Sequence, residues 1–460
     1  MQLYVVRHQQ SVANTNNIIQ GPEDNSPLTQ QGKNNARKLA DRIYEELVGQ
    51  QVYRVVSSPL ERATQTARII ADRLGVPVVY DDSLVEFDPG ILAGPKDQAA
   101  ELYPQHLEIW NQRGDLDGIF CAEKGDDLQA RSIYFLERYM DADKDLIEIV
   151  VSHAGFNRSM VNTATSNPRN YPIGHEHDQI HIIKDPWQTI DVKRLELAKA
   201  SQSYRIKTPD QTYVMKRIFG ATEEDMQFQY KISAHVAKDG ELLSRVLYWG
   251  MRPDHAVQVL NFLKGNHVYG TLTTKQKMNL LSASYELGQR LKTAPSDLRK
   301  IYNHTLKDKI EDCIADLDDS PIRRIGRNLL DNPRYRFLVS EVPDVVVHYD
   351  LHRSNILFTE HDDVRVLDLG SFLYAPKSFL PASLFMSFYM LEEQDDFSLD
   401  QLINYWPEKL NKQDITILMQ ARAIIGSSFF QKKISKNDYS VDDYEIFKKY
   451  LNSLKIIDSI

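Results

Sequence analysis

Side chains that can handle phosphate occur in four separate stretches of the first 160 residues. Arg7 and His8 follow an apolar run, Arg62 opens a helical pattern, Glu86 lies in a turn-rich loop, and His153 ends the run LIEIVVSH. A neutral imidazole can attack phosphorus while guanidinium groups hold the charge that develops on the phosphate oxygens. The leaving alkoxide needs a proton, which a carboxylic acid can deliver. These residue types predict phosphoryl transfer through a phosphohistidine, without a cofactor, because the arginines supply the positive charge.

The same stretches occur in the order found in a known superfamily. The matching segments are RHQQSVAN, LTQQGKNNA, SSPLERATQTA, LVEFDPGILAG and SHAGFNR, so residues 1–195 resemble the histidine phosphatase (phosphoglycerate-mutase-like) superfamily. The resemblance implies that His8 is the phosphorylated nucleophile and that Glu86 is the proton donor. It also implies that phosphate is bound by His153, which we count among the catalytic residues, and by three further side chains, Arg7, Asn14 and Arg62.

Two details near this group need interpretation. Gln9 stands where the superfamily has a glycine after the nucleophile, and a side chain there can crowd the pocket or change its specificity. GHEHDQIH places His175, His177 and His181 on one face of a possible strand. Alternate strand residues share a face, as metal ligands do, but the pattern favours a polar strand that rims the phosphatase pocket.

A second group of chemically active residues lies near the other end of the chain. Asp350, in HYDLHRSN, follows an apolar run and can accept a proton from a substrate hydroxyl. Asn355 and Asp368, thirteen residues apart, offer the oxygen ligands that Mg²⁺ prefers. Lys216 lies on a predicted strand far upstream, in TYVMKRI. Kinases use the same set of residues: one aspartate that orients the nucleophile, an asparagine and an aspartate that bind the metal, and a lysine on a strand.

This second group resembles the aminoglycoside phosphotransferase and choline kinase family over residues 200–460. The family's His-Gly-Asp-Leu-His-x-x-Asn run is matched with Tyr349 in place of the glycine. The resemblance implies that Asp350 is the catalytic base. It further implies that Asn355 and Asp368 bind Mg²⁺, and that Lys216, together with the same asparagine, contacts the phosphates of ATP.

Other parts of the kinase pattern are less complete. VLNFLKG at residues 259–265 matches the hinge that holds adenine, but no glycine-rich loop precedes Lys216. The acidic partner of that lysine stays open, because the next predicted helix offers Glu223, Glu224 and Gln229.

The first half of the chain alternates strand and helix patterns. LYVV, YRVVSS, VPVVY and LIEIVVSH are short apolar strands separated by amphipathic helical stretches. This alternation predicts a doubly wound α/β/α sandwich with a mainly parallel sheet. Reactive groups collect at the carboxyl ends of such strands, which is where Arg7–His8, Ser57–Ser58 and Ser152–His153 fall.

The second half follows a different pattern. YRIKTPDQTYVMKRIF predicts an antiparallel hairpin, followed by a helix near 223–238 and strands at RVLYW and AVQVLNFL. From about Thr273 the pattern is helical. The exception is residues 345–371, where two short strands are expected with a loop between them. A small β-rich lobe and a larger helical lobe together predict a two-lobed, protein-kinase-like α+β domain. We therefore expect domains at residues 1–198 and 199–460.

Length and composition limit the possible functions. The 460 residues exceed one hydrophobic core, and the formal net charge of −9 argues against sequence-independent nucleic-acid binding. The two cysteines are too few for a disulfide framework, and the longest apolar stretch, Phe379–Leu391, is too short to cross a bilayer. We expect a cytoplasmic protein that acts on small molecules and binds neither nucleic acid nor membrane; the oligomeric state is left open.

Together the two groups predict a bifunctional phosphatase and kinase for small phosphorylated or hydroxylated metabolites such as sugars or amino alcohols. The two reactions either act on different positions of one metabolite or oppose each other at one hydroxyl. We prefer the first arrangement, because an unregulated opposed pair would only hydrolyse ATP. The alternative is a regulatory or binding protein in which one domain is catalytically degenerate.

Overall fold

The computed structural model describes residues 1–111, 116–171, 174, 176–195, 201–237, 241–268, 271–315, 321–390, 397–436 and 439–457. They form two compact units. The first contains Met1–Ala221 and Leu247–Phe262, and the second contains Thr222–Val246 and Leu263–Ile460. The expected domain boundary at 198/199 lies outside the described residues.

The first unit contains a five-stranded sheet in the order β4-β3-β6-β1-β7. Its strands are β1 (Gln2–Arg7), β3 (Val52–Ser57), β4 (Val78–Tyr80), β6 (Ile147–Ser152) and β7 (Ile180–Lys184). All neighbouring pairs are parallel except β1 and β7. Every residue of β6 is buried, as expected for an apolar strand inside a covered parallel sheet.

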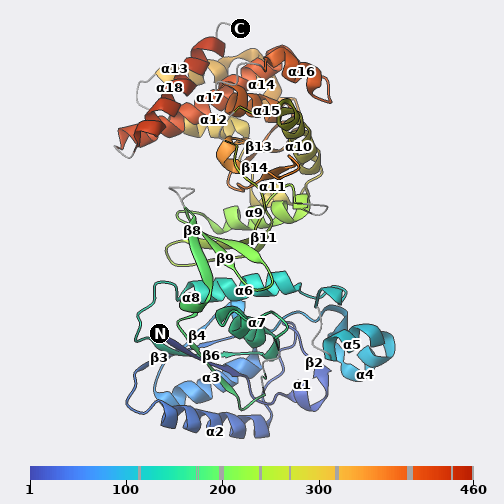
Figure 1. Ribbon diagram of the computed structural model, residues 1–460, viewed down its shortest axis with the longest axis vertical. Helices are drawn as coiled ribbons and strands as arrows, with labels where there is room; N and C mark the ends of the chain where they lie inside the picture. The colour runs from blue at the N-terminus through green and yellow to red at the C-terminus, as the bar shows by residue number, and fades with distance from the viewer. Residues whose placement is uncertain are drawn as a thin grey trace. The chain divides into compact units, whose positions relative to one another are not determined.

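Helices cover both faces of this sheet, which confirms the predicted sandwich. Figure 1 shows α2 (Gln30–Glu46) and α3 (Glu61–Leu74) on one side, and α6 (Gly125–Glu137) and α7 (Ala154–Ala164) on the other. Shorter elements of this unit are α1 (Val12–Thr15), β2 (Ile18–Ile19), β5 (Gly94–Pro95), α4 (Lys96–Leu102), α5 (Pro104–Asn111) and α8 (Pro186–Thr189). Three 3₁₀ turns span Asp82–Leu84, Gly90–Leu92 and Leu116–Gly118.

A second sheet follows, in the order β11-β12-β10-β9-β8. Its strands are β8 (Asp191–Leu195), β9 (Ser201–Lys207), β10 (Thr212–Ile218), β11 (Val246–Met251) and β12 (Ala256–Asn261). Strands β9 and β10 form the predicted antiparallel hairpin, with Lys207 opposite Thr212. We call these five strands the small sheet. Strand β8 pairs with β9, although it lies before the expected domain boundary.

Helix α6 lies between the two sheets and is buried almost all the way round. One continuous hydrophobic cluster joins Leu3 and Phe156, on the phosphatase-like side, to Tyr213 and Val257 of the small sheet. A helix buried on nearly all sides is enclosed by other elements, which here include both sheets.

The end of α6 adds a buried ionic cluster to this core. The carboxylate of Glu137, 1% exposed, lies 2.5 Å from Nε of Arg217, 3.3 Å from Nε of Arg252 and 3.2 Å from Nε2 of His255. A buried carboxylate needs such partners, because an unpaired charge in the interior is costly.

The second unit is mainly helical, as predicted. Its central helix is α17 (Lys412–Ser435), which packs against α12 (Leu306–Ala315), α13 (Pro321–Asp331), α14 (Pro333–Ser340), α15 (Phe379–Leu384) and α18 (Val441–Ile457). The remaining helices are α9 (Glu223–Val236), α10 (Thr274–Lys292), α11 (Leu298–Ile301) and α16 (Leu399–Tyr405), with a short 3₁₀ turn at Arg353–Asn355 and a π-helix at Phe385–Met390.

The expectation of two strands in this part of the chain was wrong, because there are four. Strands β13 (Asp344–His348) and β16 (Phe372–Pro376) pair with each other, and β14 (Ile356–Phe358) pairs with β15 (Val364–Val366). The run FLYAP was not identified as a strand because its partner lies far away in the sequence.

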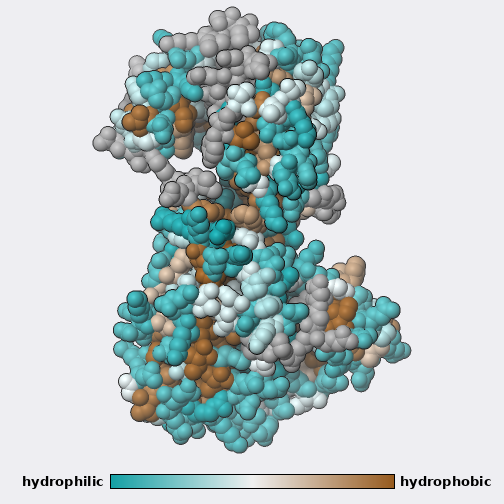
Figure 2. Space-filling view, viewed as in Figure 1, coloured by the Kyte–Doolittle hydropathy of each residue, from teal (hydrophilic) through white to brown (hydrophobic). Residues whose placement is uncertain are grey.

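No helix in the described part of the chain is long and apolar enough to cross a membrane. The apolar stretch from Phe379 enters α15 and the following π-helix, and Leu391 lies outside the described residues. On the face drawn in Figure 2, hydrophilic residues predominate, and hydrophobic ones gather in small groups.

Candidate active sites

The carboxyl ends of three parallel strands bring the N-terminal candidates together. The backbone N–H of His8, just after β1, donates to the carbonyl of Ser152 at the end of β6, at 2.8 Å. The N–H of Ser58, just after β3, donates to the carbonyl of Val151 at 3.0 Å. As a result, the rings of His8 and His153 lie 5.0 Å apart between centroids.

The imidazole of His8 is held in one tautomer. It is 2% exposed, and its Nδ1 lies 2.8 Å from the carbonyl oxygen of Gln9. A carbonyl oxygen only accepts, so Nδ1 carries the proton and Nε2 keeps its lone pair. Burial lowers the pKa of His8 well below its usual 6.5, and nearby His153 and Arg7 act in the same direction. A neutral imidazole with a free Nε2 has the form that a nucleophile requires.

His153 carries a buried nitrogen without a hydrogen-bond partner. Its Nε2 lies 2.8 Å from the hydroxyl of Ser58, whereas Nδ1 is buried and has no such partner among the described residues. Burial lowers the pKa of His153 well below its usual value, and the charges of Arg62 and Arg7 add to the effect. Because unsatisfied buried polar atoms are rare, Nδ1 marks a place where a polar ligand would be stabilised.

Two arginines lie beside the histidine pair. Arg62, at the start of α3, is fully buried, and its guanidinium donates to the carbonyl oxygens of Asp24 and Gly21. Burial lowers the pKa of Arg62, and likewise that of Arg7, while Glu86 opposes the change in both. An arginine remains charged even so, and the two guanidinium groups therefore favour an anion here.

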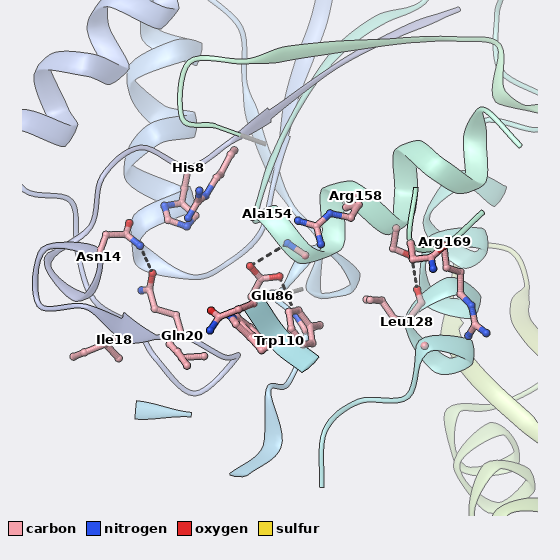
Figure 3. A pocket seen from close by; sticks show the side chains of 18 of the residues that line it. His8, Asn14, Ile18, Gln20, Glu86, Trp110, Leu128, Ala154, Arg158 and Arg169 are labelled. Carbon is pink, nitrogen blue, oxygen red and sulfur yellow. Dashed lines mark hydrogen bonds between the residues drawn. The ribbon is translucent and has the colours of Figure 1, made fainter. Parts of the chain in front are cut away.

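Glu86 lies at the first turn of α7. Its Oε1 accepts from the N–H groups of Phe87, at 3.0 Å, and Phe156, at 3.1 Å, and its Oε2 accepts from Gly155 at 3.3 Å. The N-terminus of a helix attracts a carboxylate in this way. Figure 3 shows Glu86 in the pocket, beside the start of α7 at Ala154.

The side chains of Asn14 and Gln9 form hydrogen bonds to different parts of the first unit. The Oδ1 of Asn14 caps its own helix by accepting from Ser11 N–H at 3.0 Å, and its Nδ2 donates to Gln20. Gln9 is 2% exposed, does not line the pocket and donates through Nε2 to the carbonyl of His177. The side chain of the glutamine that replaces the superfamily glycine is thus directed at the carbonyl oxygen of His177.

A cavity of about 620 Å³ opens beside these residues. Figure 3 shows His8 at one side and Arg169 at the other, with Glu86 and Trp110 between them. Among the predicted residues, those that line it are Arg7, His8, Asn14 and Glu86, whereas Arg62 and His153 are buried outside its lining. The lining also includes residues that the sequence reasoning missed, among them Lys96, Trp110, Arg158, Arg169 and Asp210.

The expectation for GHEHDQIH was partly wrong. His177 lies in a turn, not in a strand, and β7 begins only at Ile180. Its Nδ1 lies 2.7 Å from the carbonyl of His8, and its ring lies 5.7 Å from that of His8. His181 is on β7, and His175 lies outside the described residues.

In the second unit, His348 organises the loop after β13. It is fully buried, its Nε2 lies 2.9 Å from the carbonyl of Asp368, and the N–H of Asp350 donates to its Nδ1 at 3.3 Å. The amide of Asn355 donates to the carbonyl of Asp350 at 3.0 Å, and Leu367 N–H donates to the carbonyl of Asn355 at 2.9 Å. One hydrogen-bonded network thus brings the three predicted residues of this loop together.

Asp350 is paired with a cation that the sequence reasoning missed. Arg422 of α17, with a side chain 4% exposed, donates through Nη2 to Oδ1 at 2.6 Å and through Nε to the carbonyl of Tyr349 at 2.8 Å. His352 Nε2 lies 3.3 Å from Oδ2. Burial alone would raise the pKa of Asp350, but the hydrogen bond from His352 and the charge of Arg422 outweigh it and lower the pKa.

Asn355 and Asp368 fit a magnesium site in their chemistry. Nδ2 of Asn355 is used by the loop, which leaves Oδ1 for a cation. The Asp368 carboxylate is oriented by the N–H of Gly370 at 3.1 Å and the hydroxyl of Ser371 at 2.9 Å. Within the described ranges no group of three His, Cys, Asp or Glu side chains is arranged for a metal. One carboxylate and one amide are nevertheless enough for Mg²⁺, which takes most other ligands from water and phosphates.

Lys216 lies on β10, in the first unit. Its neighbours Met215 and Arg217 point towards α6, so alternation places Lys216 on the opposite face of the small sheet. The helix α9, with the three candidate partners of this lysine, belongs to the second unit. The partner of Lys216 stays open.

Two family models match the chain side by side. Residues 3–187 match the histidine phosphatase superfamily (branch 1), and residues 191–406 match the phosphotransferase enzyme family.

Curated relatives are similar to part of the chain. A protein described as "Probable phosphoglycerate mutase GpmB" from Enterobacter sp. (strain 638) is 41% identical over 92 residues, which are 20% of this chain and 40% of that protein. The protein of the same description from Escherichia coli (strain K12 / DH10B) is 32% identical over 157 residues, covering 33% of this chain and 69% of that protein. The chain thus spans less than half the length of the first relatives that it matches.

Solved structures resemble each part of the chain separately. Amicoumacin kinase hAmiN, in complex with AMP-PNP, Ca²⁺ and Ami, is 11% identical with a TM-score of 0.48, covering 58% of this chain and 88% of that one. YhfR of Bacillus stearothermophilus is 22% identical with a TM-score of 0.36, covering 42% of this chain and 91% of that one. The chain belongs to the histidine phosphatase superfamily over residues 3–187, and its residues 191–406 match the phosphotransferase enzyme family, which is also a family of enzymes.

Proposed function

We propose that the chain is a bifunctional enzyme, with a phosphatase in residues 1–198 and an ATP- and Mg²⁺-dependent phosphotransferase in residues 199–460. The phosphatase hydrolyses a phosphate monoester through a phosphohistidine at His8. The observation that carries this proposal is the buried histidine pair. His8 is neutral and its Nε2 lone pair is available for attack, and Nδ1 of His153 is buried without a hydrogen-bond partner among the described residues.

The phosphatase reaction has two steps. Nε2 of His8 attacks phosphorus and the P–O ester bond breaks, while protonated Glu86 gives its proton to the departing alkoxide. A water molecule then attacks the phosphorus of the phosphohistidine, the Nε2–P bond breaks and returns its electron pair to His8, Glu86 takes up the water's proton, and inorganic phosphate leaves. Arg7 and Arg62 stabilise the charge on the phosphoryl oxygens in both steps, since their guanidinium groups stay charged when buried.

The phosphotransferase proposal is supported by the loop around His348. Asp350 orients the hydroxyl of the acceptor and receives its proton, while Asn355 and Asp368 hold the metal. When bound, Mg²⁺ neutralises the charge of the ATP phosphates. Lys216 contacts those phosphates, and the acceptor is a small hydroxylated metabolite.

Paired variants test both activities in the full-length protein. Purified enzyme is assayed with p-nitrophenyl phosphate, and separately for ATP turnover with Mg²⁺ and a panel of sugars and amino alcohols. His8→Ala should abolish the first activity and spare the second, and Asp350→Asn should do the reverse. His361→Ala and Asp400→Asn, with side chains 78% and 68% exposed, are matched controls. If wild-type protein shows neither activity, a regulatory or binding role replaces this proposal.

A further inference from the structure

Part of the phosphatase pocket is built by a residue of the phosphotransferase half. Asp210 lies in the TPDQ turn between β9 and β10, and it lines the same cavity as His8 and Glu86. Its carboxylate accepts a hydrogen bond from the N–H of Arg169 at 2.9 Å and lies 4.0 Å from Nε of the same residue. With a side chain 19% exposed, Asp210 keeps some of its surface accessible.

The turn is fixed to the phosphatase core through α6. Tyr213, three residues after Asp210 and fully buried, donates its hydroxyl to Oε1 of Gln129 on α6 at 2.6 Å. Met215 continues the same face of β10 into the shared hydrophobic cluster. Asp210 is therefore held in the pocket wall by packing, and its place there does not depend on a loose loop.

The pocket wall beside Asp210 holds two carboxylates and one guanidinium. Nη1 of Arg169 lies 2.5 Å from Oδ1 of Asp126 on α6, so two carboxylates surround one guanidinium. A Cβ on Gly125, next to Asp126, would lie 2.6 Å from Nη1, so the glycine leaves room for the arginine. Because these groups pair as donors and acceptors and carry one more negative than positive charge, this wall suits hydroxyl groups better than a second phosphate.

An aromatic pair lines the pocket between His8 and this wall. The rings of Trp110 and Phe87 are stacked, with centroids 5.1 Å apart and an interplanar angle of 27°, and Figure 3 shows Trp110 beside Glu86. Flat apolar rings combined with a few oriented polar groups are the usual composition of a small-molecule site. This combination matches a ligand that is apolar on its carbon face and hydroxylated at its edge.

We propose that Asp210 is a specificity-determining residue of the phosphatase pocket, where it and Arg169 hold the hydroxyl groups of a sugar or polyol phosphate whose phosphate lies at His8. The inference rests on the proposed phosphatase function. It makes the phosphotransferase half a contributor to substrate selection in the phosphatase half.

The test compares two substrate classes in wild-type protein and in Asp210→Ala and Asp210→Asn. The measured quantity is kcat/KM for hexose and pentose phosphates divided by kcat/KM for p-nitrophenyl phosphate. Asp210→Ala should lower this ratio about tenfold or more, mainly through KM, as expected when a substrate hydroxyl loses a charged hydrogen-bond partner. Asp210→Asn keeps an acceptor oxygen and should recover part of the ratio. Asp191→Ala, on β8 with a side chain 57% exposed, is the matched control.

The outcomes separate this inference from the proposed function. Absence of p-nitrophenyl phosphate hydrolysis in wild-type protein overturns the phosphatase proposal itself. If that hydrolysis is present and depends on His8 but the ratio is unchanged in Asp210→Ala, the specificity role alone is refuted. A purely structural Asp210 would lower the melting temperature and reduce kcat/KM for both substrate classes equally, and that result also overturns the inference.

Discussion

Acidification provides a direct test of the neutral histidine pair. His8 and His153 are 2% and 0% exposed, and burial together with neighbouring positive groups lowers both pKa values well below 6.5. We expect both imidazoles to stay neutral in the folded protein at pH 5.5. The Nε2 lone pair of His8 would then remain available at a pH where an ordinary histidine is only about one-tenth neutral.

The same shifts make the folded protein sensitive to acid. The unfolded chain takes up protons on these histidines as the pH falls through 6.5, whereas the folded chain does not, so acid favours unfolding. The destabilisation grows until the pH reaches the lowered pKa values of the folded state. Between pH 7.5 and 5.5 each histidine should lower the free energy of unfolding by on the order of 1 kcal/mol.

Two measurements check this expectation in the ligand-free, full-length protein. Carbon-13 NMR of histidine-labelled protein, with His8→Gln and His153→Gln used to assign signals, follows each imidazole between pH 8 and 5. Urea unfolding at pH 7.5 and 5.5 gives the acid sensitivity of the wild type and of each variant. In each variant, acidification should lower the free energy of unfolding by less than in the wild type, with a difference on the order of 1 kcal/mol.

A titration midpoint at or above 6.5 for His8 would refute the reasoning. Such a midpoint would mean that the two guanidinium groups and the burial do not exclude a proton from the pair. Equal acid sensitivity in the wild type and both variants would lead to the same conclusion, because then neither imidazole differs in protonation between the folded and unfolded states.

Three further substitutions test other parts of the structure. Glu137→Ala should lower the free energy of unfolding by about 3–5 kcal/mol in urea titrations, because buried cations lose their shared carboxylate. Gly155→Ala should reduce phosphatase kcat about tenfold or more and leave ATP turnover unchanged. The new Cβ would lie 2.3 Å from Phe87 and would displace the nearby carboxyl group of Glu86. Arg422→Gln removes a positive charge that lowers the pKa of Asp350, so burial should raise that pKa. On acidification the phosphotransferase activity of the variant should therefore fall at a higher pH than that of the wild type. A pH–rate profile equal to the wild type would contradict this.

The two sites could be recognised from the sequence because their key residues occur in short local runs. Arg7 ends β1 and His8 follows it directly, and the HYDLHRSN run contains the candidate base Asp350, the candidate metal ligand Asn355 and the histidine that ties the loop together, His348. The rules for parallel sheets then bring His153 beside His8 without knowledge of the intervening chain. Positions at strand ends are predictable when topology is simple.

Residues that complete each site from a distance could not be predicted. Arg422 is 72 residues from Asp350 and sits inside an apolar helical run, where nothing local marks it as an ion-pair partner. His177 contacts the backbone of His8 from a turn that was expected to be a strand. Both contacts depend on tertiary packing, which overrides local pattern.

The small sheet packs against α6 because part of that helix would otherwise be exposed. The sequence patterns of the two halves, taken separately, do not show this. Helix α6 is buried on almost every side, and the phosphatase-like sheet can cover only part of it. The rest of its surface is covered by Tyr213, Met215 and Val257 of the small sheet, in one continuous core. The same strand that begins after Asp210 at the phosphatase pocket goes on to carry Lys216. The two families therefore meet in a shared core, and a substitution inside that core should disturb the phosphatase pocket and the small sheet together.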